Sequence, residues 1–357
     1  MTATVIPFRL PLSSPLSTAK GTIDERRGFV FRVNGPEPGL GEATPFPGFT
    51  ESLTACREAL TRAETALRDG DWSDAFEAVT AAPERTPAAR HAVALAYHDS
   101  LAKQKGVPLY SHFEGTDGAE QNTEPTPVPV NATIGDRDGD ELVQAADAAF
   151  DQGFPAVKVK VGTRPIETDA ERLRRVTSVA TAGTTVRADA NGAWSRERAG
   201  TFFDLIDPLD IEYVEQPLAP SDVEGHASLR RTVETPIALD ESVVTRPLGR
   251  LLSKEAASYV VLKPMALGGP DVARAMAQSI LEANRTPVIS TTIDAVLART
   301  AAVHVAASLP EGPPAGLATA DRLERDLAPD PAPVESGTMR PPGKPGLGIG
   351  EVTIPDA

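Results

Sequence analysis

The sequence is poor in lysine and cysteine and has no long apolar run. Of its 357 residues only eight are lysine, against 27 arginines, and Cys56 is the single cysteine. One cysteine excludes an internal disulfide and favours a cytoplasmic protein. No stretch approaches the roughly 20 consecutive apolar residues of a membrane helix, and the first residues lack the pattern of a signal peptide. We therefore expect a globular cytoplasmic protein without a membrane partner.

Positive charge is scarce as well. The 50 acidic residues outnumber the 35 basic ones, which gives a net charge of −15. Such a field makes nucleic acids and anionic membranes poor partners. An acid excess with few lysines is typical of proteins from salt-loving archaea, and a GC-rich genome gives a similar bias toward Arg, Ala and Asp. The composition leaves both interpretations open.

The first third of the chain mixes strand and helix patterns. Two strands and three helices are predicted there, the strands over 4–10 and 28–33 and the helices over 51–68, 72–80 and 86–105. A polar stretch rich in Gly and Pro follows near 115–128 and is typical of a linker. At the usual one to two hundred residues per domain, the chain length predicts two domains.

Beyond residue 128 the pattern changes and repeats. Short apolar strands alternate with amphipathic helices, and eight strand ends are predicted near Ile134, Lys160, Asp189, Glu215, Asp240, Lys263, Ser290 and Leu317. The steps between these positions hold one strand, one helix and two loops each. Eight such units favour a parallel sheet closed into a barrel, with an open doubly wound sheet as the alternative. No barrel helix is predicted after the eighth strand, and we expect the remaining tail to pack on the first domain.

Two of the eight lysines lie in one predicted strand, AVKVKV at 156–161. Alternation places Lys158 and Lys160 on one face and the valines on the other. A solvated edge strand is the ordinary interpretation of such a face. Because a closed barrel has no edge, we predict that both lysines point into its lumen. There the charge of Lys158 would help Lys160 to give up its proton.

The next three strands end in carboxylates, and the sixth ends in a lysine. Asp189, Glu215 and Asp240 follow one another at the carboxyl ends of adjacent strands, where barrel enzymes build their active sites. Loop acids are common and Asp often caps helices, but three together would repel one another unless a hard cation such as Mg²⁺ lies between them. Lys263 would face Lys160 across the lumen. The set suits proton abstraction next to a carboxylate.

These motifs together resemble the muconate lactonizing enzyme subgroup of the enolase superfamily. The segment GEATPFPGF at 41–49 resembles the capping-domain loop of these enzymes, and VPVNATI at 128–134 resembles their first barrel strand. The resemblance implies a (β/α)7β modified TIM barrel at 128–319 and an N-terminal α+β capping domain at 1–127, completed by 320–357.

Within the subgroup, two further segments resemble the o-succinylbenzoate synthases. They are GLAT at 316–319 and PGLGIGE at 345–351. This resemblance implies a syn-dehydration that forms o-succinylbenzoate through an enediolate, in menaquinone biosynthesis, with a small-molecule carboxylate as the partner. The oligomeric state is left open, with a homo-oligomer as one expectation.

The resemblance also implies a role for each site residue. Mg²⁺ is expected on three carboxylates, those of Asp189, Glu215 and Asp240. Lys160 is expected to be the acid–base catalyst, Lys263 to stabilise the enediolate from the opposite face, and Lys158 to assist electrostatically. Substrate contacts are expected at the strand ends, from Asn191, Ser290, Thr291, Thr292 and Leu317.

Other functions fit parts of the pattern. The two lysines also permit N-acylamino acid racemization, dipeptide epimerization or cycloisomerization. Dipeptide epimerases tend to carry Asp-x-Asp at the last strand, where this chain has 316–319 as Gly-Leu-Ala-Thr, so acylamino acid racemization remains the closer alternative. A mandelate racemase-like mechanism would need a His–Asp dyad in place of Lys263, and none is visible. A non-catalytic ligand-binding barrel is the alternative from another class.

Overall fold

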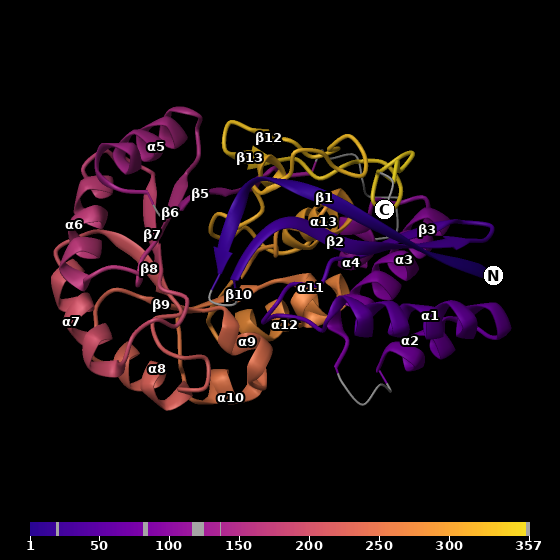
Figure 1. Ribbon diagram of the computed structural model, residues 1–357, viewed down its shortest axis with the longest axis horizontal. Coiled ribbons are helices and arrows are strands. Elements are labelled where there is room, and N and C mark those ends of the chain that lie inside the picture. The colour runs from indigo at the N-terminus through magenta and orange to yellow at the C-terminus, as the bar shows by residue number, and fades with distance from the viewer. Residues whose placement is uncertain (19–20, 81–84, 116–124, 136, 355–357) are drawn as a thin grey trace.

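The computed structural model describes residues 1–18, 21–80, 85–115, 125–135 and 137–354. Figure 1 shows two parts: a capping part with a long hairpin and helices, and a barrel with helices around its outer wall. The predicted linker lies mostly outside the described residues. The fold class expected from the sequence, a (β/α)7β barrel with an N-terminal α+β cap, is confirmed.

The cap is a three-stranded antiparallel sheet packed on helices. Its strands are β1 (Thr2–Thr18), β2 (Gly21–Asn34) and β3 (Gly39–Ala43), and its helices are α1 (Leu53–Asp69), α2 (Trp72–Thr80), α3 (Pro87–Lys105) and α4 (Leu109–Glu114). The predicted helices agree with α1, α2 and α3 to within two residues. The hairpin strands are longer than predicted. The N-terminal half of β2, at 21–27, is polar, and it therefore carries no apolar pattern from which a strand could be predicted.

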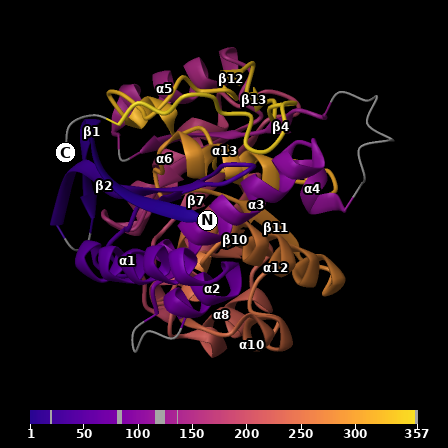
Figure 2. The same ribbon diagram turned by 90° about the vertical axis from the view of Figure 1, so that its right-hand side faces the viewer.

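The cap sheet lies very close to α3, as the view in Figure 2 helps to follow. A Cβ atom on Gly41 would stand 1.8 Å from the carbonyl oxygen of Ala92, so only glycine fits at this point of β3. The single cysteine, Cys56, is buried in the cap core.

The barrel contains seven parallel strands in sequential order. They are β5 (Asn131–Gly135), β6 (Ala156–Lys160), β7 (Thr185–Asp189), β8 (Ile211–Glu215), β9 (Ile237–Leu239), β10 (Tyr259–Leu262) and β11 (Thr286–Ile289). The helices between and after them are α5 (Gly139–Asp151), α6 (Ile166–Thr177), α7 (Arg196–Ile206), α8 (Val223–Arg230), α9 (Glu241–Thr245), α10 (Leu248–Ser253), α11 (Pro264–Leu267), α12 (Pro270–Glu282) and α13 (Val296–Ala307). The strands end within one residue of the predicted positions.

Two residues close the barrel in place of a full eighth strand. The Ala315 amide donates to Pro129 and its carbonyl accepts from Asn131, while the Gly316 amide donates to Ile289. The predicted last strand, AGLAT, is therefore longer than the observed bridge. Two prolines stand just before Ala315 and cannot donate to a ladder, which keeps this strand short.

Alternate side chains of β6 point to opposite sides of the barrel wall. Val157 and Val159 are fully buried in the main core, whereas Lys158 and Lys160 are partly exposed and pair with carboxylates of neighbouring strands. The predicted orientation of the two lysines into the lumen is confirmed. Deeper in the lumen lies a small cluster of buried side chains, Tyr213, Ala238, Val261 and Val288.

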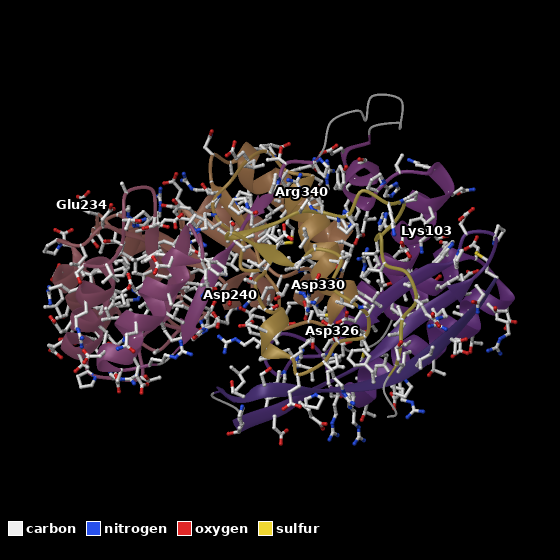
Figure 3. All side chains as sticks on the ribbon, turned by 90° about the horizontal axis from the view of Figure 1, so that it is seen from above. Lys103, Glu234, Asp240, Asp326, Asp330 and Arg340 are labelled. Carbon is white, nitrogen blue, oxygen red and sulfur yellow. The ribbon has the colours of Figure 1, made fainter. Side chains whose placement is uncertain are left out.

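The C-terminal tail bonds to both parts. It includes η2 (Ala320–Arg322), β12 (Val334–Glu335) and β13 (Thr338–Met339), and β13 pairs with β4 (Val128–Pro129). Asp326 and Asp330, labelled in Figure 3, form ion pairs with the buried Arg299 of α13. On the cap side, the Leu347 amide donates to Asp99 of α3. The domain boundary near residue 128 stays a prediction. Across the described residues, no helix has the length and apolarity to cross a membrane.

A buried carboxylate joins the cap to the barrel. Glu42 of β3 is fully buried and accepts hydrogen bonds from the amides of Ala295 and Ala298, each at 2.8 Å, at the start of α13. Thr44 also donates to it. Free amides at a helix N-terminus favour an anionic partner, so Glu42 ties the capping sheet to the barrel wall.

We predict that Glu42→Gln lowers the free energy of unfolding by about 1–3 kcal/mol, because an amide nitrogen would then face a buried backbone N–H. Chemical denaturation against the exposed control Glu58→Gln measures the effect. Equal stability of the two variants would contradict the role given to Glu42.

Candidate active site

Parallel register brings the predicted acids of three strands together. Lys160 is the register partner of Asp189, and Asp189 is the partner of Glu215. Asp240 follows directly after β9. All three carboxylate residues are at most 2% exposed. The carboxyl ends of β7, β8 and β9 thus gather three buried acids, and Figure 3 labels Asp240 on the barrel.

Each acid lies against a lysine. Lys160 Nζ stands 2.6 Å from Asp189 Oδ2, and Lys158 Nζ stands 2.9 Å from Glu215 Oε2 and 3.4 Å from Asp189 Oδ2. Lys263, which follows β10, donates to Asp240 Oδ2. The structure therefore brings the three predicted lysines and the three predicted acids into one network.

Burial and ion pairing shift the pKa values of several of these groups. Burial raises the pKa of Asp240 to about 6 even though Lys263 favours its charged form. Burial also raises the pKa of Glu215, with repulsion from Asp189 in the same direction. Burial alone would lower the pKa of Lys158, but the carboxylates of Glu215 and Asp189 hold it well above its usual range. Lys158 is thus a fixed cation in this arrangement.

The predicted residue Asn191 connects Lys160 to an acid that the sequence interpretation missed. Its Oδ1 accepts from Lys160 Nζ at 2.8 Å, and its Nδ2 donates to Glu241 Oε1 at 3.0 Å. Asn191 has φ 45°, a left-handed conformation that Asn tolerates better than most residues. Glu241 directly follows Asp240, and this pair of adjacent acids was the available signal.

Gln216 holds the backbone after β9 in place, and the sequence interpretation did not identify it. It directly follows Glu215, is fully buried, and has φ 45°. Its Oε1 accepts from the amides of Asp240 and Ser242. These two bonds fix the backbone that carries Asp240.

A ring from the cap covers one of the two opposing lysines. The ammonium of Lys263 lies 4.1 Å from the ring centroid of Phe49, a cation–π distance. Phe49 belongs to the segment that resembles the capping-domain loop, but nothing in its sequence pattern distinguishes it from Phe46. The Lys263 side chain is 13% exposed and that of Lys160 is 34% exposed, so the two lysines differ in access.

The predicted substrate contacts at the last strands lie close together but have partners of their own. Ser290 donates to the carbonyl of Gly316, the Thr291 hydroxyl lies 3.2 Å from that of Thr319, and Thr292 donates to Asp294. The predicted contact Leu317 is fully buried in the main hydrophobic core. Their contact with a substrate stays a prediction.

No three acids, histidines or cysteines of the described residues stand assembled around a metal position. The lysine ammonium groups occupy the space between the carboxylates instead. The donor set itself suits a hard divalent cation, because all three acids are buried and Glu215 Oε1 has no hydrogen-bond partner among the residues that the structure describes. A cation bound here would relieve the cost of these buried anions.

A cavity of about 640 Å³ lies away from this network. It is lined by the start of β11 and by segments of α4 and α13, among them Tyr110, Thr286 and Leu309. None of the predicted site residues lines it. The buried acids and lysines described above thus lie apart from this cavity.

Comparisons with known proteins identify the family of this chain. The family model described as "Enolase C-terminal domain-like" matches residues 141–351. The L-Ala-D/L-Glu epimerase of Bacillus subtilis is 28% identical over 350 residues, which are 95% of this chain and 93% of that protein. The o-succinylbenzoate synthase of Thermobifida fusca is 40% identical over 210 residues, which are 57% of this chain and 63% of that protein.

A solved structure of an epimerase has the same fold. The dipeptide epimerase of Enterococcus faecalis V583, in complex with Mg and the dipeptide L-Leu-L-Tyr, superposes with a TM-score of 0.87 at 26% identity. The match covers 98% of this chain and 99% of that chain. Epimerases and synthases are thus both similar to this chain, and similarity alone does not separate their reactions.

We predict that Asn191→Gly lowers the free energy of unfolding by about 1 kcal/mol, because the bonds to Lys160 and Glu241 are lost while the left-handed backbone is kept. Asn284 has φ 55° and is exposed, so Asn284→Gly is the matched control and should be nearly neutral. Chemical denaturation compares the two. A loss of equal size at both positions would show that the Asn191 side chain holds nothing in place.

Proposed function

This chain belongs to the enolase superfamily, and we propose that it is an Mg²⁺-dependent lyase of the muconate lactonizing enzyme subgroup. The proposed reaction removes water from 2-succinyl-6-hydroxy-2,4-cyclohexadiene-1-carboxylate and yields 2-succinylbenzoate (o-succinylbenzoate), a step of menaquinone biosynthesis. Members of the superfamily are enzymes, and they include lyases and epimerases. The choice between the two rests on the site.

The observation that supports a lyase is the difference between the two opposing lysines. Lys263 is paired with Asp240, covered by Phe49 and largely buried, which suits a permanent cation. Lys160 is the more exposed of the two and shares its ammonium between Asp189 and a neutral amide, Asn191. A syn-dehydration needs one proton carrier on one face, whereas racemization needs a working acid–base group on each face.

Asp189, Glu215 and Asp240 would hold the Mg²⁺ ion. When bound, this ion would polarise the substrate carboxylate and favour the negative charge that develops on it. Asp189 would then turn from Lys160 to the cation and leave Asn191 as the remaining partner of that lysine. Gln216 would keep the backbone at Asp240 in place.

Lys160 carries the proton through both steps. As a neutral amine, its Nζ takes the proton from the ring carbon next to the carboxylate, and the electrons of the broken C–H bond move into the carboxylate as an enediolate. The ring C–O bond to the hydroxyl then breaks, and the electrons return to form the aromatic ring. The leaving hydroxide takes the proton from Lys160, which yields water and restores the amine.

The other two lysines act through charge. Lys263 would stabilise the enediolate from the opposite face, where its position under Phe49 limits contact with water. Lys158 keeps its own proton because Glu215 and Asp189 hold its pKa high. Asn191 and the hydroxyl-bearing strand end at 290–292 would contact substrate, as would Leu317 after a shift of its surroundings.

N-acylamino acid racemization is the second candidate function. It is favoured by the presence of a lysine on each side of the lumen. Assays with the dehydration substrate and with an N-acylamino acid, each with Mg²⁺, compare the two directly. We expect a higher kcat/KM for dehydration, and a higher value for racemization would replace the lyase proposal by the racemase.

We predict that Lys160→Ala lowers the dehydration rate by about 10²–10⁴-fold, the range of a lost general acid–base group, while Mg²⁺ binding persists. Absorbance of the aromatic product measures the rate, and calorimetry measures the binding. Lys254, an exposed lysine paired with Glu224, supplies the control Lys254→Ala, which should keep full activity. Substantial residual turnover would remove Lys160 from its assigned role.

We predict that Asp240→Asn weakens Mg²⁺ binding by at least about tenfold, because the site loses one anionic donor. Titration calorimetry with MgCl₂ measures the Kd, and Asp210→Asn at an exposed position is the control. The affinity of the unaltered protein should also fall below about pH 6, where Asp240 gains a proton. An unchanged Kd in the variant would contradict the ligand assignment.

A further inference from the structure

Arg26 of β2 is a buried arginine whose guanidinium donates hydrogen bonds to two different loops. It is 2% exposed, and its Nη1 and Nη2 donate to the carbonyls of Pro45 and Thr44 at 3.1 and 2.9 Å. Its Nε donates to the carbonyl of Ile293 at 3.0 Å. Thr44 and Pro45 belong to the cap, and Ile293 belongs to the turn between β11 and α13 in the barrel.

The turn that Arg26 holds is strained. Ile293 has φ 60°, and a β-branched residue in the left-handed region is rare and costly. Such a conformation persists only where the surroundings impose it. The turn directly follows Thr291 and Thr292 at the end of the seventh barrel strand, so the hydrogen bond from Arg26 helps to set the backbone that presents these side chains.

The cap loop that Arg26 holds leads to the active-site lysine. The guanidinium carbon lies 4.8 Å from the ring centroid of Phe46, and the Phe46 and Phe49 rings stand edge to face at 5.9 Å. Phe49 in turn covers the ammonium of Lys263 at 4.1 Å. An unbroken series of contacts therefore runs from Arg26 to Lys263.

Arg26 remains charged in its buried position. Burial lowers its pKa to about 10, and the buried carboxylates of Asp294 and Glu42 favour its charged form. Three of its N–H groups are committed to backbone carbonyls in a planar fork, a geometry that the point charge of lysine does not reproduce. The guanidinium thus acts on the protein backbone.

We propose that Arg26 is a positioning residue for substrate recognition, which locks the cap segment 44–50 to the barrel turn 290–295 and so fixes both the ring of Phe49 over Lys263 and the hydroxyl groups at 290–292. Under the proposed function, the strand end at 290–292 contacts the substrate and Lys263 stabilises its enediolate. The acids of the proposed metal site lie on other strands, β7 to β9, and have no contact with Arg26. Loss of the lock should therefore impair substrate binding far more than the chemical step. The kinetic part of this proposal rests on the proposed function, and the structural part does not.

The test compares Arg26→Met and Arg26→Lys with a matched control, Arg90→Met. Arg90 also joins cap to barrel, from α3 to Asp271 at 2.9 Å, but it contacts neither of the two segments. The first readout is hydrogen–deuterium exchange of backbone amides in the full-length protein. We expect Arg26→Met to speed exchange about tenfold or more in both 44–50 and 290–295, and to change the strands β7 to β9 by less than about twofold.

The second readout is kinetic. With the dehydration substrate, Arg26→Met should raise KM about tenfold while kcat changes less than about threefold, and Arg26→Lys should fall between this variant and the unaltered protein. Arg90→Met should lower the melting temperature without raising KM or exchange in the two segments.

Three results would overturn the proposal: faster exchange in only one segment, a uniform rise over the whole barrel, or the same exchange pattern in Arg90→Met. An unchanged KM for Arg26→Met would overturn its kinetic part. If the unaltered protein turns over neither candidate substrate, the proposed function fails, and the exchange experiment still decides whether Arg26 locks the two segments. If Arg26→Met does not fold, exchange and KM are compared between Arg26→Lys and the unaltered protein.

Discussion

The pairing of three lysines with three carboxylates inside the barrel is the interaction on which the rest of the site depends. Six charges at the carboxyl ends of the strands are mostly removed from water, and each would be costly without its partner. Among the described residues the acids stand paired with lysines and are not grouped around a metal position, yet carboxylates are the donors that Mg²⁺ prefers.

The cap gives Lys160 and Lys263 different surroundings. Phe49 covers Lys263, whereas Lys160 remains the more accessible lysine. Glu42 and Arg26 fasten the cap to the barrel from within the interface, one by accepting from the start of α13 and the other by donating to Ile293. The position of Phe49 therefore depends on contacts far from the lysine that it covers.

Much of the fold and of the site could be predicted from the sequence because both follow from periodicity. Alternation in β6 placed Lys158 and Lys160 on one face, and the spacing of strand ends placed Asp189 at the same edge of the sheet as its neighbours. The length of the last strand, which closes the barrel at Ala315, was overestimated. An apolar segment reveals its strand character but not how many hydrogen bonds it makes. The domain boundary and the roles of the site residues stay predictions.

The contacts that could not be predicted join distant parts of the chain. Arg26 and Ile293 are 267 residues apart, and no local pattern reveals that the carbonyl of one accepts from the other. Phe49 and Phe46 look alike in the sequence, and only the packing of the cap decides which ring reaches Lys263. Glu241 was visible as an acid, but its bond to Asn191 depends on the left-handed turn after β7.

The proposed mechanism requires that Lys160 transfer the proton and that Lys263 supply only its charge. The most direct measurement is the dehydration rate of Lys160→Arg beside that of Lys263→Arg, since arginine keeps the positive charge and does not release its proton at working pH. We expect Lys263→Arg to keep at least about a tenth of the dehydration rate and Lys160→Arg to lower this rate by about 10²-fold or more. Equal loss in both variants, or no dehydration by the unaltered protein, would contradict this mechanism.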